Sequence, residues 1–484
     1  MTGPLPGAAL PEAARDRELR RRDWRFLRPG IALQPLRAWS AAALRAVRAG
    51  GSPEGIYLES HAPLPGAPAL RARLEAAGFE DVALYWPCPT LGRPWFWLPL
   101  GSAAALEYVR ATRLPARSPL RRAVDRPLRA VWHWAAAHGR LWPICAVARP
   151  AASPRSADDL LQRIAGEWTA WGLGSPPARL TWMLVTRGVR SINKVVGLVF
   201  AEPDPLPRMV VKLPRVPEAA DGLRREAVAL AAVAARAPGG HPGVPRLLFC
   251  DERSGGLALA ETALPGRPLF TMLAEGAYRD LALRAADWLA ALAAVPAAGP
   301  PGAAGRMVER ALREFATAFG PVVDQAELQA TERLVAPLAD LPSVIEHRDF
   351  SPWNVHVGPD GGLLAYDWES AEPAGLPLND LVYFLAYLAF FHDGAIASGR
   401  CPESYRRARD LPTLTGRVHR ECVARYAERV GLDERHVRAL HALTWVIHAR
   451  SEYLRFAADA GVEPPAAALR RSLFVNLWRQ ELRA

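Results

Sequence analysis

The sequence predicts an α+β protein in which a small α/β module (residues 1–150) precedes a small β-rich lobe (151–265) and a large helical lobe (266–484). Arginine is concentrated in the first 150 residues, short β-branched runs gather between residues 195 and 261, and helical periodicity dominates from residue 278 onwards. A chain of 484 residues is also long enough for two or three domains.

The net charge of +11 belongs entirely to the first module. Residues 1–150 hold 22 arginines and 11 acidic residues, whereas residues 151–484 hold 38 residues of each sign. Eight of the 16 tryptophans also lie in the module. Arginine together with tryptophan suits an anionic partner or a membrane surface, and it equally suits a solvated basic face over buried aromatic residues. Nothing in the pattern indicates specific nucleic-acid binding.

Within the module, helical and strand patterns alternate. Helices are expected at residues 40–48, 69–77, 103–110 and 128–138, and strands at 55–59 and 82–85. Residues 86–100 contain four prolines, so we expect a loop or an edge there. The order helix, Gly78-Phe79, strand and loop resembles the C-terminal portion of class I S-adenosylmethionine-dependent methyltransferases. The glycine-rich cofactor turn of that family has no counterpart in this sequence. The module is either a degenerate relative without methyl transfer or an unrelated α/β unit.

The cysteines and the apolar runs bear on the cell compartment. The five cysteines are far apart and form no C-x-x-C pair, which is typical of a reducing compartment. No apolar run approaches the length of a membrane span, and the first residues do not read as a secretory signal. We therefore expect a cytoplasmic protein.

The β-rich lobe and the helical lobe differ in their patterns. In the first, strands are expected at residues 195–200, 209–213, 247–250 and 257–261, with a helix at 218–236. In the second, a short strand at 343–346 is surrounded by helices at 278–294, 308–319, 324–338, 378–391, 415–430, 434–458 and 465–482.

One stretch of the helical lobe carries a specific motif. It reads His347-Arg348-Asp349-Phe350-Ser351-Pro352-Trp353-Asn354, and Asp367-Trp368-Glu369 follows an apolar strand thirteen residues later. Phosphoryl transfer uses such a set, because a carboxylate orients the attacking hydroxyl while an amide oxygen and a second carboxylate hold magnesium on the phosphates. Turn-forming polar residues would not need this spacing.

These residues resemble the aminoglycoside phosphotransferase and choline kinase family over residues 180–390. The resemblance implies a bilobal protein-kinase-like fold that uses ATP and Mg²⁺. It makes Asp349 the catalytic base and assigns the metal site to Asn354, Asp367 and Glu369. His347 is expected to brace the loop, and Asn379-Asp380 to cap the following helix. Asp367-Trp368-Glu369 departs from the D-F-G of protein kinases, which favours a small-molecule kinase.

The resemblance also predicts a nucleotide site. Lys212 lies in an apolar strand and is one of only two lysines beside 58 arginines, so we expect it to contact phosphate while Glu226 fixes it. No complete G-x-G-x-x-G is present. Ser191 and Asn193 are the candidate phosphate donors in a short loop that an ordinary hairpin turn would also explain. Glu261 and Ala263 resemble the hinge whose backbone binds adenine.

The acceptor stays open at this stage. From residue 391 onwards there are 16 arginines and 11 acidic residues, which disfavours a polycationic acceptor. A kinase for a hydroxyl on a sugar, an amino alcohol or a related metabolite is the leading hypothesis. An aminoglycoside-inactivating kinase and a catalytically silent nucleotide-binding or scaffold protein are the alternatives.

Overall fold

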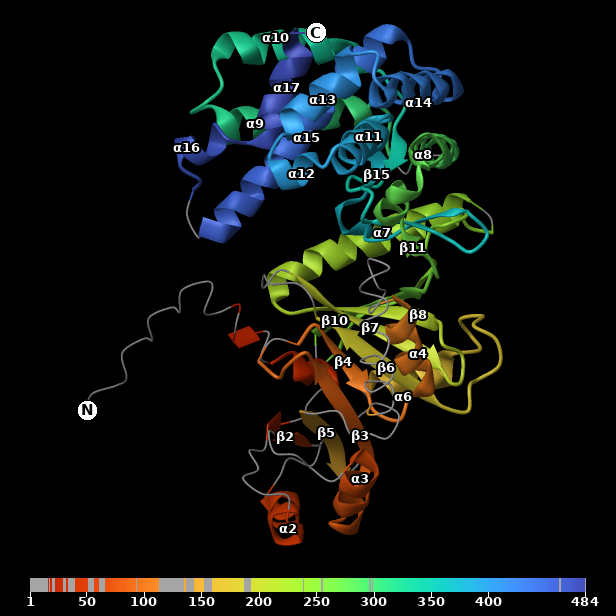
Figure 1. Ribbon diagram of the computed structural model, residues 1–484. Helices are drawn as coiled ribbons and strands as arrows, with labels where there is room; N and C mark the ends of the chain where they lie inside the picture. The colour runs from red at the N-terminus through yellow and green to blue at the C-terminus, as the bar shows by residue number, and fades with distance from the viewer. Residues whose placement is uncertain are drawn as a thin grey trace, which may run out of the picture. The chain divides into compact units, whose positions relative to one another are not determined.

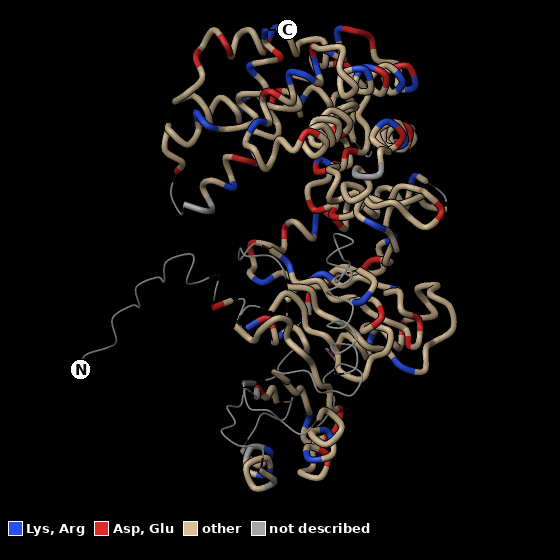
Figure 2. The backbone as a smooth tube through the Cα atoms, viewed as in Figure 1, with Lys and Arg blue, Asp and Glu red and all other residues tan. Residues whose placement is uncertain are grey.

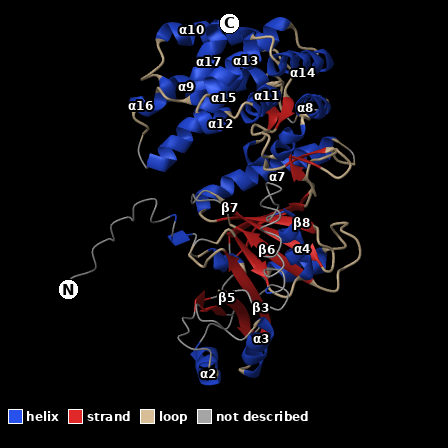
Figure 3. Cartoon of the chain, in the orientation of Figure 1, coloured by secondary structure: helices blue, strands red, loops and turns tan. Residues whose placement is uncertain are grey.

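The computed structural model folds into two compact units, Met1–Leu223 with Leu247–Pro265, and Arg224–Arg246 with Gly266–Ala484 (Figure 1). The described residues are 16, 18–19, 22–28, 32–33, 40–50, 56–60, 66–92, 94–112, 135, 143–151, 159–186, 193–237, 239–253, 256–295, 297, 299–460 and 463–483. Strands dominate the first unit and helices the second (Figure 3). The predicted α+β class, with a β-rich and a helical part, is confirmed.

In the first unit, the described residues contribute ten strands to one sheet of order β1-β2-β5-β3-β4-β6-β7-β8-β10-β9. Strand β1 runs parallel to β2, and the other neighbouring strands of this sheet pair antiparallel. The strands span Ala32–Leu33 (β1), Ile56–Ser60 (β2), Phe79–Cys88 (β3), Phe96–Pro99 (β4), Ile144–Pro150 (β5), Leu180–Val185 (β6), Lys194–Ala201 (β7), Pro207–Pro214 (β8), Leu247–Arg253 (β9) and Gly256–Thr262 (β10).

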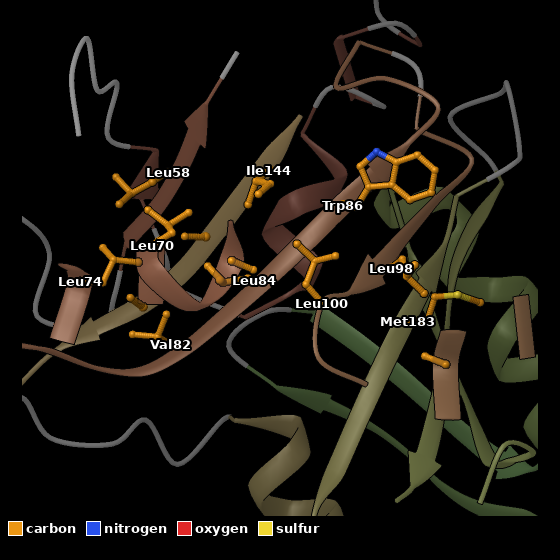
Figure 4. Close-up of a cluster of buried hydrophobic side chains, with 14 of the residues drawn as sticks. Leu58, Leu70, Leu74, Val82, Leu84, Trp86, Leu98, Leu100, Ile144 and Met183 are labelled. Carbon is orange, nitrogen blue, oxygen red and sulfur yellow. The ribbon is translucent and has the colours of Figure 1, made fainter. Parts of the chain in front are cut away.

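Both faces of this sheet are buried, and each carries its own core. Along β5, Ile144 and Ala146 enter one cluster while Cys145 and Val147 enter the other, as the two-residue period of a strand requires. Helices α2 (Ala41–Gly50), α3 (Ala67–Ala76) and α4 (Ala103–Thr112) supply side chains to the first cluster. Figure 4 shows side chains of α3, β3 and β5 gathered there. Helix α6 (Leu160–Glu167) and the short helix η1 (Asp23–Phe26) cover the second.

The proline-rich stretch 86–100 corrects a prediction. It contributes the end of β3 and all of β4, which pair with each other inside the sheet, and only the connection between Cys88 and Phe96 is the expected loop. Strand β3 pairs with β5 only up to Tyr85, so Pro87 lies where β3 has a partner on one side alone. Pro99 likewise lies beyond the β4–β6 pairing, which involves Phe96 and Trp97. The missing N–H of each proline therefore costs the sheet no ladder hydrogen bond.

The strands of the N-terminal module and of the β-rich lobe share this one sheet. Phe96 and Trp97 of β4 face Val185 and Leu184 of β6 across the predicted boundary at residue 150. Three of the module's tryptophans, Trp24, Trp86 and Trp97, are buried in the two cores, whereas Trp95 is exposed. Ala135 is the one described residue of the expected helix 128–138, which otherwise lies outside the described residues.

The second unit is mainly helical. Its helices are the later part of α7 (Ala220–Arg236), then α8 (Tyr278–Ala293), α9 (Ala303–Phe319), α10 (Gln325–Val335), α11 (Asn379–His392), α12 (Ala395–Ser398), α13 (Cys401–Asp410), α14 (Leu414–Val430), α15 (Glu434–Ala460), α16 (Ala466–Leu469) and α17 (Leu473–Arg483). The segments between these helices also contain short strands, which are β11 (Arg267–Pro268), β12 (Val344–Glu346), β13 (Val355–Val357), β14 (Leu363–Ala365) and β15 (Glu372–Gly375). No helix in the described part of the chain has the length and hydropathy of a membrane span.

Helix α11 is the centre of this unit. It is buried nearly all round and contacts α8, α13, α14 and α15, as expected of a helix that is apolar on every face. The predicted helix 465–482 is broken, because the Ser472 hydroxyl accepts the Val475 N–H at 3.2 Å and starts α17 as an N-cap.

Candidate active site

The motif residues lie on two connected loops of the second unit. Strand β12 leads into His347-Arg348-Asp349, and β13 and β14 form an antiparallel hairpin in which Val355 faces Ala365. The Tyr366 N–H donates to the Asn354 carbonyl at 2.9 Å, which extends this register by one pair. Asn354, before β13, and Asp367, after β14, therefore leave the hairpin at the same end.

Asp349 and Asn354 are in direct contact. The Asn354 Nδ2 donates to Asp349 Oδ2 at 2.7 Å and to the Asp349 carbonyl at 3.1 Å. With its nitrogen bound in this way, the side chain of Asn354 offers its oxygen to a cation. An amide oxygen and the carboxylate of Asp367 are ligands that Mg²⁺ accepts alongside phosphate oxygens and water.

The electrostatics around Asp349 also fit a cation. Burial raises the pKa of Asp349 to about 8, the charges of Asp367 and Glu369 add to the rise, and hydrogen bonds from Asn354 and Tyr383 oppose it. The charges that raise the pKa of Asp349 must lie close to it, and a divalent cation would relieve the repulsion. Among the described residues, no three His, Cys, Asp or Glu side chains are grouped to hold a metal by themselves.

Two side chains brace the loop from behind. The His347 ring is buried, lies 2.9 Å from the Tyr366 carbonyl through Nε2, and accepts the Asp349 N–H through Nδ1 at 3.3 Å. This pair of contacts selects the Nε2–H tautomer. His347 thus braces the loop, as the sequence analysis expected.

Contrary to expectation, Asp380 does not cap α11 but binds the loop before Asp349. Its two oxygens accept the backbone N–H groups of His347 at 2.6 Å and Arg348 at 2.7 Å, so it fixes the backbone immediately before Asp349. Burial and the neighbouring Glu346 raise the pKa of Asp380 to about 7. The N-cap position of α11 is Leu378, in a left-handed conformation and without a side-chain capping hydrogen bond.

Glu226 and Glu369 lie near this site within the second unit. The buried Glu226 accepts the Trp368 N–H at 2.9 Å, and the neighbouring Arg225 donates to the Glu369 carbonyl at 3.1 Å. Helix α7 thereby holds the segment that carries Asp367 and Glu369. The predicted pairing of Lys212 with Glu226 stays a prediction.

Lys212 lies in the first unit, on β8, and its ammonium forms an ion pair with Glu261 at 2.8 Å. Both side chains are buried. The β8–β10 register explains the contact, because Lys212 faces Leu259 and Glu261 lies two residues further along the same face. The sequence pattern indicated a role only for the backbone of Glu261, and the contact of its carboxylate with Lys212 is new.

The other predicted nucleotide residues flank β7 and β10. Ser191 lies outside the described residues. The Asn193 carbonyl accepts from Arg215 at 3.4 Å, and the same guanidinium reaches the Thr186 carbonyl at 3.0 Å. The Ala263 N–H donates to the Arg208 carbonyl at 3.1 Å.

Arg215 is held by a residue that the sequence analysis passed over. Asp23 binds its guanidinium through both carboxylate oxygens, at 2.9 and 3.0 Å, and both side chains are fully buried. No motif could reveal a contact between residues 192 positions apart.

An aromatic wall that was also missed adjoins Asp349. We use this name for Trp353, Tyr383, Tyr387, Phe391 and Phe270, which form a chain of ring contacts with centroids 4.8–6.0 Å apart. Trp353 and Phe270 are 36% and 37% exposed. The one signal in the sequence was the position of Trp353 inside the motif.

Comparison with known proteins addresses the family. A search of the curated proteins found no match. Among solved structures, choline kinase LicA from Streptococcus pneumoniae is 14% identical, with 60% of this chain and 88% of that chain covered and a TM-score of 0.37. Aminoglycoside phosphotransferase APH(3'')-Id from Streptomyces rimosus, in complex with ADP and streptomycin, is 17% identical, with 59% and 98% covered and a TM-score of 0.34. At these values neither likeness bears on substrate or mechanism.

The match to a family model is more specific. It begins within β7 and covers β8, the helix α7, the loop that carries Asp349 and the segment after β14. The resemblance that the motifs indicated is thus confirmed over this range: residues 198–421 match the phosphotransferase enzyme family.

Proposed function

We propose that this protein is a kinase that transfers the γ-phosphate of ATP to a hydroxyl of a small molecule, such as a sugar or an amino alcohol. The observation that carries the proposal is the Asp349–Asn354 hydrogen bond of 2.7 Å beside the charge of Asp367. Asp349, the proton acceptor, thus lies beside Asn354 and Asp367, the two side chains suited to magnesium, and phosphoryl transfer uses these three groups together.

Asp349 accepts the proton of the acceptor hydroxyl and orients it. Its raised pKa makes it a stronger base than an exposed aspartate once it is ionised. Asn354 and Asp367 would hold Mg²⁺, with Glu369 in support, and the ion would neutralise charge on the phosphates. His347 and Asp380 keep the backbone of Asp349 in place.

Candidate nucleotide contacts are proposed for each unit by itself. Lys212 supplies an ammonium to the phosphates, with Glu261 fixing it at 2.8 Å. Glu226 positions the Asp367 segment through the Trp368 N–H. Ser191 and Asn193 are candidate phosphate contacts, and the backbone at Glu261 and Ala263 is the candidate adenine contact.

The aromatic wall supports an acceptor with an apolar ring face or an alkyl-ammonium group. Trp353 is exposed beside the catalytic loop, and Tyr383 contacts Asp349 directly. Aromatic faces bind the C–H faces of sugars and the cations of amino alcohols. An aminoglycoside acceptor is less favoured, because the chain from residue 391 onwards holds 16 arginines and 11 acidic residues.

The test is an ATP-consumption screen with Mg²⁺ across sugars, amino alcohols, nucleosides and aminoglycosides. We expect turnover with an uncharged or singly charged acceptor. A thermal-shift titration with Mg-ATP separates the silent alternative, because a ligand that binds only the native state must raise the unfolding temperature. Absence of both turnover and stabilisation would refute the proposal.

Two further proposals concern the cell compartment and the partner of the basic residues 1–150. We assign the reaction to the cytoplasm from the spacing of the cysteines. An anionic partner or a membrane surface for the arginines of residues 1–150 is a secondary proposal, and vesicle sedimentation with and without anionic lipid tests it.

A further inference from the structure

A cavity of about 450 Å³ in the second unit adjoins the catalytic loop. Four arginines line it, each from a different element: Arg225 of α7, Arg310 of α9, Arg348 of the loop and Arg450 of α15. Its acidic lining residues are Glu314 and Glu372. The lining therefore carries a surplus of two positive charges.

The guanidinium groups of this arginine cavity retain hydrogen-bonding capacity. Arg450 pairs with Glu314 at 2.7 Å and Arg310 with Glu372 at 3.1 Å. Arg348 lies between Glu346 and Glu372 at 3.9 and 3.8 Å, beyond hydrogen-bond distance from either. A guanidinium has five N–H donors, so these contacts leave most of them available to another acceptor.

Arg225 likewise retains hydrogen-bonding capacity. Its one contact within the described residues is with the backbone carbonyl of Glu369, at 3.1 Å, and no carboxylate there neutralises it. The nearest carboxylate oxygens to Arg348, on Glu346 and Glu372, lie 3.9 and 3.8 Å away. Two of the four arginines thus lack a close counter-ion.

The cavity is distinct from the reacting groups but adjacent to them. Its lining includes none of Asp349, Asn354 and Asp367. Arg348, however, precedes Asp349 in the loop, and His448 of the lining stacks on Tyr383 with ring centroids 3.9 Å apart. Tyr383 hydrogen-bonds to Asp349.

A second cavity, of about 1130 Å³, shares Arg225, Met307, Arg310 and Glu372 with the first. Its apolar lining includes Val228, Ala231 and Ala232 of α7, and Val228 is 59% exposed. The shared residues show that the two cavities adjoin. An organic group attached to an anion in the first cavity would have room in the second.

We propose that the arginine cavity is a binding site for a phosphate-type anion, either inorganic phosphate or the phosphate of a small phosphate monoester. Convergent guanidinium groups match the tetrahedral oxygens of phosphate through charge-assisted hydrogen bonds. The site is additional to the proposed nucleotide and acceptor sites, and its occupation is measured without reference to turnover.

The test measures binding of inorganic phosphate and of glycerol phosphate to the full chain by calorimetry and thermal shift. Chloride keeps the ionic strength constant, and Mg-ADP occupies the nucleotide site. The test variant is Arg310→Gln/Arg450→Gln, whose side chains are 46% and 44% exposed. We expect phosphate affinity to fall roughly tenfold or more for each charge-assisted hydrogen bond lost. Stabilisation by Mg-ADP should persist.

The matched control is Arg425→Gln/Arg429→Gln on α14. These arginines are 45% and 46% exposed, both pair with Asp287, and their loss changes the net charge by the same amount. The control should bind phosphate like the wild type. Three results would each overturn the proposal. They are an equal loss of phosphate affinity in the control, an unchanged phosphate affinity in the test variant, and no binding of either anion to the wild type. Tighter binding of glycerol phosphate than of phosphate would identify the monoester as the ligand.

Discussion

Replacement of Asp23 by alanine is expected to destabilise the first unit strongly. Asp23 and Arg215 form a bidentate ion pair with N–O distances of 2.9 and 3.0 Å, and their side chains are 0% and 1% exposed. Solvent cannot screen or replace the contact at such burial. Removing one partner of a buried pair leaves an uncompensated charge, which costs roughly 3–5 kcal/mol.

The same substitution should weaken nucleotide binding. Arg215 donates to the carbonyls of Thr186 and Asn193, which flank the segment that contains Ser191. When its carboxylate partner is lost, the guanidinium is no longer held on these two carbonyls. We expect a higher KM for ATP together with the loss of stability.

Urea unfolding followed by tryptophan fluorescence measures the first effect, and a double-mutant cycle isolates the pair. Asp23→Ala and Arg215→Met should each lower the free energy of unfolding, and the double variant should lose less than the sum of the two because neither charge is left alone. Single losses below about 1 kcal/mol, or strictly additive losses, would show that the pair is not the buried contact described.

Three further predictions concern the second unit. Asp380→Asn removes the charge that accepts two loop N–H groups, so kcat should fall while KM for ATP changes little. A change in KM with kcat unaltered would contradict this. Tyr383→Phe removes a hydrogen bond that lowers the pKa of Asp349, so the acidic limb of the kcat/KM profile should move to higher pH; an unmoved limb would exclude the contact. Burial lowers the pKa of His448 to about 3. Its contribution to stability is therefore complete above the unfolded pKa of about 6.5 and falls below it by about 1.4 kcal/mol per pH unit. In His448→Phe, the urea midpoint of unfolding should fall less between pH 7 and pH 5 than it does in the wild type. The same fall in both proteins would refute the assignment.

The local patterns of the chain predicted its elements well. The strand pair at residues 195–213 and the helix at 218–236 appear as β7, β8 and α7, because period and turn residues act over short distances. The motif around Asp349 was recognisable for the same reason. Its spacing reflects one hairpin, in which β13 and β14 bring Asn354 and Asp367 to a common end.

The features that the sequence did not reveal depend on distant partners. Pro87 and Pro99 are tolerated inside the sheet only because the β3–β5 pairing ends at Tyr85 and the β4–β6 pairing ends at Trp97. The ion pairs Lys212–Glu261 and Asp23–Arg215 arise from strand register and from packing across the sheet, which composition does not encode. The methyltransferase-like resemblance of residues 1–150 stays a prediction.

The most direct test of the account is turnover by Asp349→Asn with an acceptor identified in the ATP-consumption screen. The variant keeps the size of the side chain and its contact with Asn354 but cannot accept the hydroxyl proton. The account predicts a loss of roughly 10²–10⁴-fold in kcat, with stabilisation by Mg-ADP preserved. Turnover equal to that of the wild type would contradict the role of Asp349 and with it the proposed mechanism.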